Sequence, residues 1–520
     1  MDTKKLRQKL LDLAIRGKLV PQDPNDEPAS ELLSRIHEEK LTMVERGELK
    51  PKDVKNDTVI YFGSDGLPYE KRADGKGEAK CIDKEILFDL PEGWSWTRVN
   101  AVCPVGTGAT PLKANKAYYE NGTIPWITSG SATKGVIIEP DGYITELALR
   151  ETNCVVYPVE SLVVAMYGEG KTRGSVATLR IDAATNQACA VLRKIEKGCL
   201  QSYIKICYEN SYDALREKAQ GGNQPNLNQS VVSNLLIPVP PLAEQRRIVD
   251  ALGKYLALVD GIERDRAELD VLLAQLKSKV LDLAVRSELT ERDQKDEPAS
   301  ELLARIREEK LAMVGRGELK SKDVKNDTVI FTGSDGLRYE KPADGKGGAK
   351  CIEKEIPFEV PEGWSWSRME RLIQLTSGID LAKADYNSEH NGIPYITGAS
   401  NFENGSLIEN RWTDKPKRIS HRGDLLFTCK GTVGKMAINK FASAHIARQV
   451  MAINPYRGVD KLYLQQVLAW HVETIRRKAK GFIPGIERGV LLKALVPVPP
   501  LAEQRRIVRA IEAVTSATSL

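Results

Sequence analysis

Two glycine-containing turns place basic and hydroxyl side chains where a polar ligand could bind. Residues 165–172 (AMYGEGKT) fit the relaxed phosphate-loop pattern and follow a strand-like run. A phosphate loop opens a helix, whose N-terminal N–H groups bind phosphate. Here residues 173–179 are instead typical of a strand. We therefore predict a hairpin tip that presents Lys171, Thr172 and Arg173, and we do not expect a nucleotide site.

A second turn, residues 430–435 (KGTVGK), is the counterpart of the first and carries Lys430, Thr432 and Lys435. A solvated tip is the alternative to a binding role in both turns. Other basic side chains with the same potential to contact guanine or phosphate are Lys134, Arg411, Lys415, Arg448 and Arg488.

Amide side chains cluster in the stretch 222–228 (GNQPNLN). Asn and Gln can bond bidentately to an adenine edge, which makes Gln224, Asn226 and Asn228 candidate base-reading residues. The alternative for each is a turn residue that bonds its own backbone, and for any single residue the two interpretations are about equally favoured.

The patterns of an enzyme are missing from the sequence. Asn454-Pro455-Tyr456 resembles the amino-methyltransferase signature Asn-Pro-Pro-aromatic but lacks one proline. We find no glycine-rich loop suited to a methyl donor, and no nuclease or helicase motif. The histidines and cysteines have no HExxH or CxxC spacing. We expect no catalytic residue, no metal site and no cofactor in this chain.

Length and charge set broad limits. A chain of 520 residues is expected to fold as several domains. It has no apolar run of about 18 residues or more and no apolar signal segment near Met1, which predicts a cytoplasmic protein without a membrane partner. Residues 88–240 carry 14 basic and 14 acidic side chains, whereas residues 358–499 carry 20 and 13. The second region would therefore attract the phosphate groups of a nucleic acid more strongly.

The sequence contains an internal repeat. Residues 26–50 match residues 296–320 at 21 of 25 positions, and PEGWSW at 91–96 recurs at 361–366. A closing block, PVPPLAEQRRIV, starts at Pro238 and recurs unchanged from Pro497. Two dissimilar segments, the variable units, lie between these shared frames. They are roughly residues 97–237 and 367–496.

The frame is predicted to be helical. From Val259 to Leu283, apolar residues recur every three or four positions, with Arg266 as the only charged member. That spacing is a coiled-coil seam, and it predicts a helix over residues 243–286. The two chain ends match this helix and would supply its antiparallel partner, less about nine residues in the middle. Taken alone, such a helix is more often a dimerising or packing element.

The variable units are predicted to be mixed α/β, since IPWIT at 124–128 and IPYIT at 393–397 are strand-like and similar. The expected fold class is α+β, with two α/β units separated by two long antiparallel coiled-coil helices in a circular, pseudo-twofold repeat. The predicted boundaries are 1–50 and 242–320 for helical frame, 51–87 and 321–357 for hairpin linkers, 88–241 and 358–500 for variable units, and 501–520 for the last helix.

These features together resemble the specificity subunits of type I restriction–modification systems. The matching signatures are LPEGW at 90–94, the stretch 222–228, and the closing block of each unit. The resemblance covers almost the whole chain. Where the first unit has QPNLN, the second has IPGIE at 483–487, which fits two units that read different bases.

The resemblance implies a non-catalytic DNA-recognition subunit located with the nucleoid. Each variable unit would be a target recognition domain for one half-site of double-stranded DNA, read by the basic and amide side chains named above. The helices would set the gap and dock two methylation subunits, with restriction–translocase subunits as an optional addition. Those partners would use S-adenosylmethionine, ATP and magnesium to methylate adenine or to cleave DNA.

Two other functions remain open on the residues alone. One is a self-sufficient methyltransferase or nuclease, which the missing motifs count against. The other is a scaffold that does not bind DNA, with two interaction domains on a coiled-coil spacer. Salt-sensitive, sequence-specific DNA binding would separate the recognition subunit from the scaffold.

Overall fold

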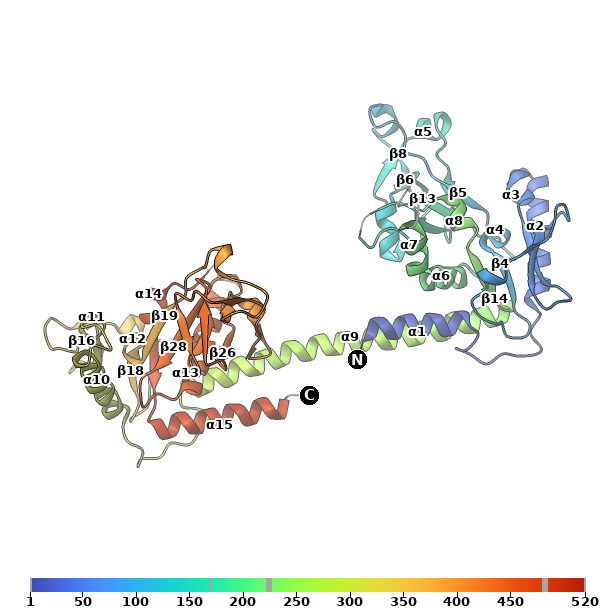
Figure 1. The fold of residues 1–520 in the computed structure, drawn as a ribbon. Coiled ribbons are helices and arrows are strands. Elements are labelled where there is room, and N and C mark those ends of the chain that lie inside the picture. Colours follow the sequence, from blue (N-terminus) through green and yellow to red (C-terminus); the bar gives the residue numbers. More distant parts are fainter. Residues whose placement is uncertain (1, 169, 221–226, 479–484, 519–520) are drawn as a thin grey trace. The chain divides into compact units, whose positions relative to one another are not determined.

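The computed structural model forms two compact units, unit 1 (residues 1–266) and unit 2 (residues 267–520), each of which mixes helices and strands (Figure 1). None of the described helices combines the length and apolar character that crossing a membrane requires. The structure describes residues 2–168, 170–220, 227–478 and 485–518.

The frame of unit 1 begins with α1 (Thr3–Ile15), whose first turn is capped by Asp2. The Lys5 N–H donates to the Asp2 carboxylate at 3.1 Å, which satisfies a helix-terminal donor. After α2 (Ala29–Glu45) and α3 (Lys52–Lys55), the chain forms the predicted hairpin of β1 (Thr58–Phe62) and β2 (Pro68–Arg72). A third strand that the sequence did not predict, β3 (Lys80–Cys81), pairs with β2.

The first variable unit starts and ends at one place, because β4 (Ser95–Arg98) pairs antiparallel with β14 (Leu236–Val239). Between them lie a five-stranded sheet, β5-β13-β10-β11-β7, and a four-stranded sheet, β8-β6-β12-β9. The strands of the five-stranded sheet are β5 (Val105–Thr107), β7 (Val136–Ile137), β10 (Leu162–Ala165), β11 (Val176–Leu179) and β13 (Cys189–Leu192). The strands of the four-stranded sheet are β6 (Ile124–Ile127), β8 (Gly142–Ile144), β9 (Val156–Tyr157) and β12 (Ala183–Thr185).

Short helices surround these sheets. Every residue of β10 and β13 is buried, as expected for continuous apolar runs at the centre of a sheet. The buried Tyr203 and Tyr208 of α6 belong to the core that also contains Leu162 and Val164. The helices are α4 (Val99–Val102), α5 (Glu146–Glu151), α6 (Gln201–Asn210), α7 (Tyr212–Gln220) and α8 (Gln229–Ser233), with 3-10 turns η1 (Asp83–Glu85), η2 (Lys116–Tyr118) and η3 (Ser129–Lys134).

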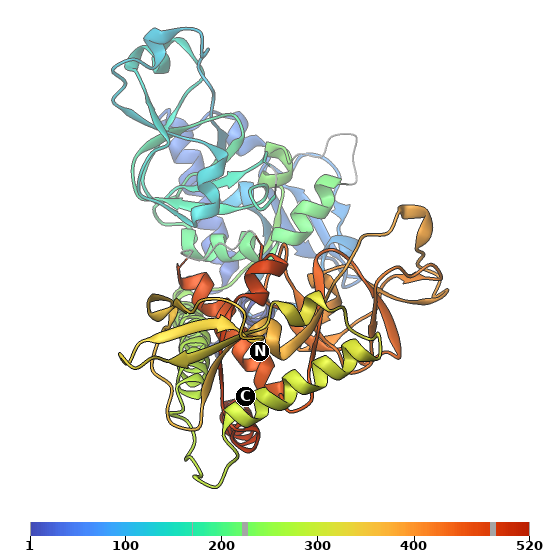
Figure 2. The same cartoon turned by 90° about the vertical axis from the view of Figure 1, so that its left-hand side faces the viewer.

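Unit 2 repeats the frame, and Figure 2 views it from the side of α10 (Ala299–Gly315). Its hairpin keeps the register of the first copy, with Phe331 opposite Tyr339 where unit 1 has Tyr61 opposite Tyr69. The remaining frame elements are α11 (Lys322–Lys325), β15 (Thr328–Thr332), β16 (Arg338–Pro342), β17 (Lys350–Cys351), η4 (Glu353–Glu355), β18 (Ser365–Arg368), α12 (Met369–Leu372) and β29 (Leu495–Val498).

The second variable unit has two four-stranded sheets, β19-β28-β25-β26 and β23-β20-β27-β24, so its first sheet lacks an equivalent of β7. The strands are β19 (Ile373–Ser377), β20 (Ile393–Ile396), β21 (Phe402–Glu403), β22 (Ser406–Leu407), β23 (Trp412–Thr413), β24 (Ile419–His421), β25 (Leu425–Thr428), β26 (Met436–Ile438), β27 (Ser443–Ile446) and β28 (Val450–Pro455). The helices are η5 (Lys383–Asp385), η6 (Ala399–Asn401), α13 (Lys461–Lys478) and α14 (Arg488–Leu492).

One continuous helix of 44 residues, α9 (Leu242–Val285), follows β14 and lies within one residue of its predicted bounds. In unit 1, α1 packs on it through a core that includes Leu11, Ile248 and Leu252. The two helices are antiparallel, because Arg7 pairs with Glu263 at 2.9 Å whereas Gln22, beyond the end of α1, bonds Glu244.

In unit 2, α15 (Leu501–Thr518) packs on the last turns of α9, with Ile507 and Ile511 in one core with Val280 and Ala284. These contacts confirm that both chain ends pair with the long helix, as the fold-class prediction requires. The middle of the seam is exposed, with Ile262 42% and Leu269 41% exposed. This agrees with a partner helix that is made from two separate chain ends and lacks about nine residues in the middle.

Candidate nucleic-acid interface

The first predicted turn is a true hairpin tip, since β10 and β11 pair antiparallel up to Val164 opposite Val176. No helix follows the GKT residues, so the structure agrees with the rejection of a phosphate loop. Lys171 is exposed, and Thr172 and Arg173 are half-buried. Among the described contacts, no ion pair involves Lys171 or Arg173, and the shielded Arg173 Nε has no hydrogen-bond partner. An unsatisfied buried donor is costly and is suited to a ligand.

The backbone of this tip is held from a neighbouring helix, α7. The Tyr212 hydroxyl donates to the Lys171 carbonyl at 2.9 Å, and Arg216 Nη1 donates to the Arg173 carbonyl at 3.1 Å. Tyr212 and Arg216 were not among the predicted site residues. Their one sequence signal is the spacing of four on a helix, which places both on the same face.

The amide-rich stretch is only partly covered by the structure. Gln224 and Asn226 lie outside the described residues, so their predicted role stays a prediction. Leu227 follows them and its N–H donates to the Met166 carbonyl at 3.1 Å, so the stretch ends beside the base of the Lys171 hairpin. Asn228 caps α8 by accepting the Val231 N–H at 2.9 Å. That contact matches the backbone-bonding alternative for Asn228.

Lys134 closes η3 immediately before β7, the parallel neighbour of β11. Its side chain is exposed, and its ammonium lies 3.9 Å from the carboxylate of Asp141. A loose exposed pair of this kind contributes little to stability. Lys134 therefore remains available as a contact on the same sheet as the Lys171 turn.

The second predicted tip connects β25 and β26. Lys430 and Thr432 are exposed there. Lys435 differs, because its ammonium donates to the carbonyls of Ala399 and Phe402, both at 3.1 Å. These bonds give Lys435 a structural role in supporting the loop that contains η6. Its predicted contact with DNA stays untested.

One more predicted residue of unit 2, Arg448, lies near this tip, and Arg488 lies on another element. Arg448 is next to Gln449, whose carbonyl accepts the N–H of Cys429 at 2.8 Å. The Arg448 guanidinium is exposed and pairs with Asp380 at 2.8 Å. Arg488 begins α14 and donates to the carbonyl of Leu375.

Arg411 and Lys415 belong to the other sheet of the second variable unit, around β23. The Arg411 guanidinium lies 5.1 Å from the centre of the Tyr386 ring, and Lys415 pairs with Asp385 at 3.5 Å. Nothing in the described contacts joins these two residues to the Lys430 turn. The sequence therefore grouped side chains that the fold distributes over two places.

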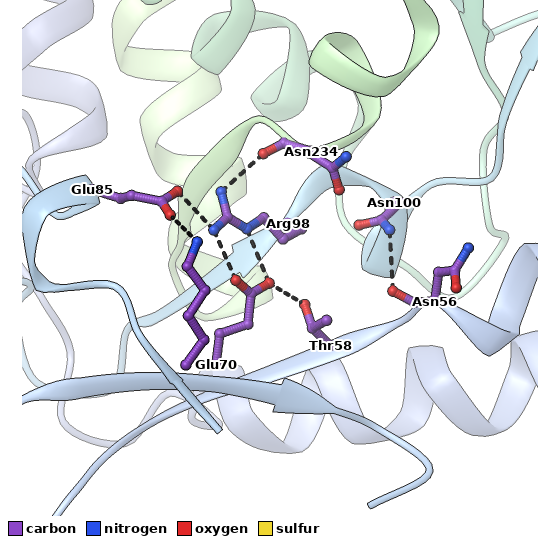
Figure 3. A network of polar contacts seen from close by, with 8 residues as sticks. Asn56, Thr58, Glu70, Glu85, Arg98, Asn100 and Asn234 are labelled. Carbon is purple, nitrogen blue, oxygen red and sulfur yellow. Dashed lines mark hydrogen bonds and ion pairs between the residues drawn. The ribbon is translucent and has the colours of Figure 1, made fainter. Parts of the chain in front are cut away.

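A polar network fixes the hairpin of unit 1 to the base of its variable unit (Figure 3). Arg98 of β4 donates to Glu70 at 3.0 and 2.8 Å, to Glu85 at 2.8 Å, and to the Asn234 carbonyl at 3.0 Å. Burial opposes the ionisation of Glu70, but hydrogen bonds from Arg98 and Thr58 outweigh it and lower its pKa. One guanidinium thus joins the hairpin to both ends of the variable unit.

Unit 2 contains the same network. Arg368 donates to Glu340 at 3.0 and 2.7 Å, to Glu355 at 2.8 Å, and to the Lys493 carbonyl at 2.9 Å. The hydrogen bonds from Arg368 lower the pKa of Glu340 despite partial burial. Sequence reasoning treated these hairpins as spacers without chemistry and missed the network in both copies.

The family model for the type I restriction modification DNA specificity domain matches the chain twice, over residues 91–270 and 361–520. The two matches each contain one variable unit. The first match ends inside α9, and the second includes α15. The chain belongs to this family. Residues 1–90 and 271–360, which contain the duplicated α2 and α10 with their hairpins, lie outside the two matches.

Curated relatives agree with the family. The chain is 25% identical to the type I restriction enzyme EcoEI specificity subunit of Escherichia coli, over 98% of this chain and 88% of the relative. It is 26% identical to the EcoAI specificity subunit of Escherichia coli, over 72% of this chain and 63% of the relative. The predicted family resemblance is therefore confirmed.

A solved structure has the same fold. A chain from a study of complex assembly and conformational transition in the type I R-M system matches with a TM-score of 0.52 and 18% identity. The match covers 83% of this specificity-family chain and 93% of that chain. The predicted mixed fold with two variable units and a long helical spacer is confirmed.

Proposed function

We propose that this chain is the DNA-recognition subunit of a type I restriction–modification complex and that it binds a bipartite double-stranded target. Each variable unit would read one half-site. The observation that carries the proposal is the twofold use of one frame around two units that share a fold but differ in their tips. A protein that reads two different half-sites from one repeated support needs this arrangement.

The hairpin tips are the part of the variable units best suited to DNA. In unit 1, Lys171 and Arg173 have no carboxylate partner among the described residues, and Arg173 carries a shielded donor without a partner. In unit 2, Lys430 and Thr432 are exposed at the matching turn. Side chains of this kind position a protein on phosphates and read guanine edges.

The long helix supplies the spacing in this proposal. At 1.5 Å per residue, the 44 residues of α9 extend about 66 Å. Two methylation subunits would dock on the repeated helical frame, one for each copy, and restriction–translocase subunits could join them. S-adenosylmethionine, ATP and magnesium would belong to those partners, and this chain would be non-catalytic. The complex would work in the cytoplasm, beside the nucleoid.

The test is to map methylated adenines in DNA from cells that make this chain together with its methylation subunits. The expected result is one bipartite motif with a fixed gap, which disappears when this chain is omitted. A purified chain that transfers methyl groups to DNA by itself would contradict the non-catalytic role. Absence of salt-sensitive, sequence-specific binding by the complex would favour a scaffold instead.

A further inference from the structure

The hairpin tip of unit 1 has its backbone held by side chains from α7 and from the hairpin itself. The Lys171 carbonyl accepts bonds from the Tyr212 hydroxyl at 2.9 Å and from the Ser175 hydroxyl at 2.7 Å. The Arg173 carbonyl accepts a bond from Arg216 at 3.1 Å. Fixing these two carbonyls fixes the 171–172 and 173–174 peptide planes. Thr172 and Arg173 lie between these planes, so the directions in which their side chains leave the turn are restrained.

Tyr212 and Arg216 also hold each other. They are four residues apart on α7, so they share a helix face. Arg216 Nη1 donates to the Tyr212 hydroxyl at 3.0 Å, and the guanidinium carbon lies 5.2 Å from the centre of the tyrosine ring. The hydroxyl therefore accepts from Arg216 and donates to Lys171 in one chain of hydrogen bonds.

The ring of Tyr212 lies against the turn itself. Gly174 has a φ of +87°, and a Cβ at this position would lie 3.4 Å from Tyr212 Cδ2. The turn thus needs glycine for its backbone conformation, because residues with a Cβ rarely adopt this φ. The Arg216 guanidinium and the Tyr212 hydroxyl therefore bond the backbone of the turn, while the Lys171 side chain stays exposed.

We propose that Tyr212 and Arg216 are positioning residues that set the sequence discrimination of unit 1 by holding the turn at residues 170–174. The inference rests on the proposed function, in which this turn contacts DNA. Side chains must be held within a fraction of an ångström for bidentate base contacts to discriminate. A turn released from α7 would still carry its positive charge, so it would bind DNA but select its sequence less well.

The experiment uses the full chain in complex with its methylation subunits and carries Tyr212→Phe or Arg216→Lys. Tyr212→Phe keeps the ring and removes one hydroxyl. Arg216→Lys keeps the charge and removes the two-pronged donor. The matched control is Tyr203→Phe, because the Tyr203 hydroxyl donates to the Pro238 carbonyl at the same 2.9 Å but is buried in the core and bonds no residue of the turn.

The readouts are the methylated-adenine motif in cellular DNA and the melting temperature of the complex. We expect methylation at sites with one mismatch to rise about fivefold in both variants, the effect of losing one hydrogen bond. The relaxed bases should all lie in one half-site, with the other half-site and the melting temperature unchanged. Tyr203→Phe should lower the melting temperature and leave the motif intact.

The possible outcomes are distinguishable. A clear bipartite motif that both variants read as faithfully as the unsubstituted chain overturns this inference and leaves the proposed function standing. Equal relaxation by Tyr203→Phe also overturns it, because any loosening of unit 1 would then have the same effect. Absence of any motif with the unsubstituted chain overturns the proposed function, and the inference with it.

Discussion

The two units hold the corresponding hairpin turn by different means. In unit 1, polar side chains of α7 bond the carbonyls of Lys171 and Arg173. In unit 2, an apolar side chain lies against the turn, since a Cβ at Gly434 would lie 2.6 Å from Val472 of α13. The turn of unit 2 is also closed internally, because the Thr428 hydroxyl donates to the Thr432 carbonyl at 2.7 Å.

The frames, by contrast, use the same contacts twice. Trp94 donates to Glu244 at 2.9 Å in unit 1, and Trp364 donates to Glu503 at 2.9 Å in unit 2. This contrast indicates that the contacts that support a turn differ between the units when the turn differs. The contacts that connect each variable unit to its helix are the same in both units. Specificity could then be altered without disturbing assembly.

The strongest test of this division is an exchange of one variable unit. Replacing residues 97–237 by the equivalent segment of a relative should change one half-site completely and leave the other half-site and the gap unchanged. The physical reason is that α7 and the turn it holds would move together, so the new turn keeps its own support. The measurement is the methylated-adenine motif of the hybrid. A motif altered in both halves would show that the units do not read DNA independently.

The sequence predicted the repeated parts of this fold well. The period of the apolar residues predicted α9 to within one residue, because a long helix records its packing in its spacing. The strands β6 and β20 were also predicted, since the runs IPWIT at 124–128 and IPYIT at 393–397 are typical of strands. The exposed middle of the seam was also expected, because the two chain ends together lack about nine residues of the partner helix.

The candidate site was predicted less completely. Residue type alone placed Lys171 and Lys435 in the same group of candidates. Both side chains are exposed, but the Lys435 ammonium bonds two carbonyls, whereas no ion pair of Lys171 is described. Tyr212 and Arg216 were missed, because a contact across 40 or more residues leaves no local pattern. Asn228 could equally have been a cap or a base contact, and only its bond to Val231 favours the cap.

The spacer gives the second largest expected effect. In unit 1, the described contacts of α1 reach α9 as far as Glu263. In unit 2, α15 and α9 line a groove that begins at Leu273 of α9. Seven residues inserted between Leu269 and Asp270 should therefore leave both packings intact. The insertion would lengthen the helix by about 10 Å, or about three base pairs, and DNA twist would rotate the second half-site by about 100°.

The expected result is a gap longer by about three base pairs or a loss of tight binding. Methylation mapping together with a binding titration on the original target distinguishes these two results. Inserting seven glycine-free residues of the same apolar spacing keeps the helix continuous, and a matching insertion in the loop at residues 74–77 is the control. Undiminished binding to the original target by the helix variant would contradict a measuring role for α9.

The hairpin tips should show a smaller effect that differs between the units. Arg173→Ala should weaken sequence-specific binding by about 1–3 kcal/mol, the usual value of a lost base contact, and leave folding unchanged. Lys435→Ala should instead lower the stability of unit 2 by about 1 kcal/mol, because it leaves the carbonyls of Ala399 and Phe402 without their donor. Binding titrations and urea unfolding of both variants check this. The reverse pattern would show that Lys435 contacts DNA and Arg173 does not.

The smallest expected effect concerns the polar network that the two frames share. Glu70→Gln or Glu340→Gln should each reduce the free energy of unfolding by about 1–2 kcal/mol at pH 7, since a bond to a charged partner is weakened.

Both carboxyls have a lowered pKa in the folded protein. Their contribution is therefore fully present above the ordinary pKa of about 4.3 and is lost as the pH falls through the folded-state value. Urea unfolding followed from pH 7 to about pH 3 should show each variant approaching the unsubstituted chain. The two carboxyls accept the same pair of bonds at nearly the same distances, so the two substitutions should have similar effects. A pH-independent difference would mean that packing, and not charge, fixes the hairpins to the variable units.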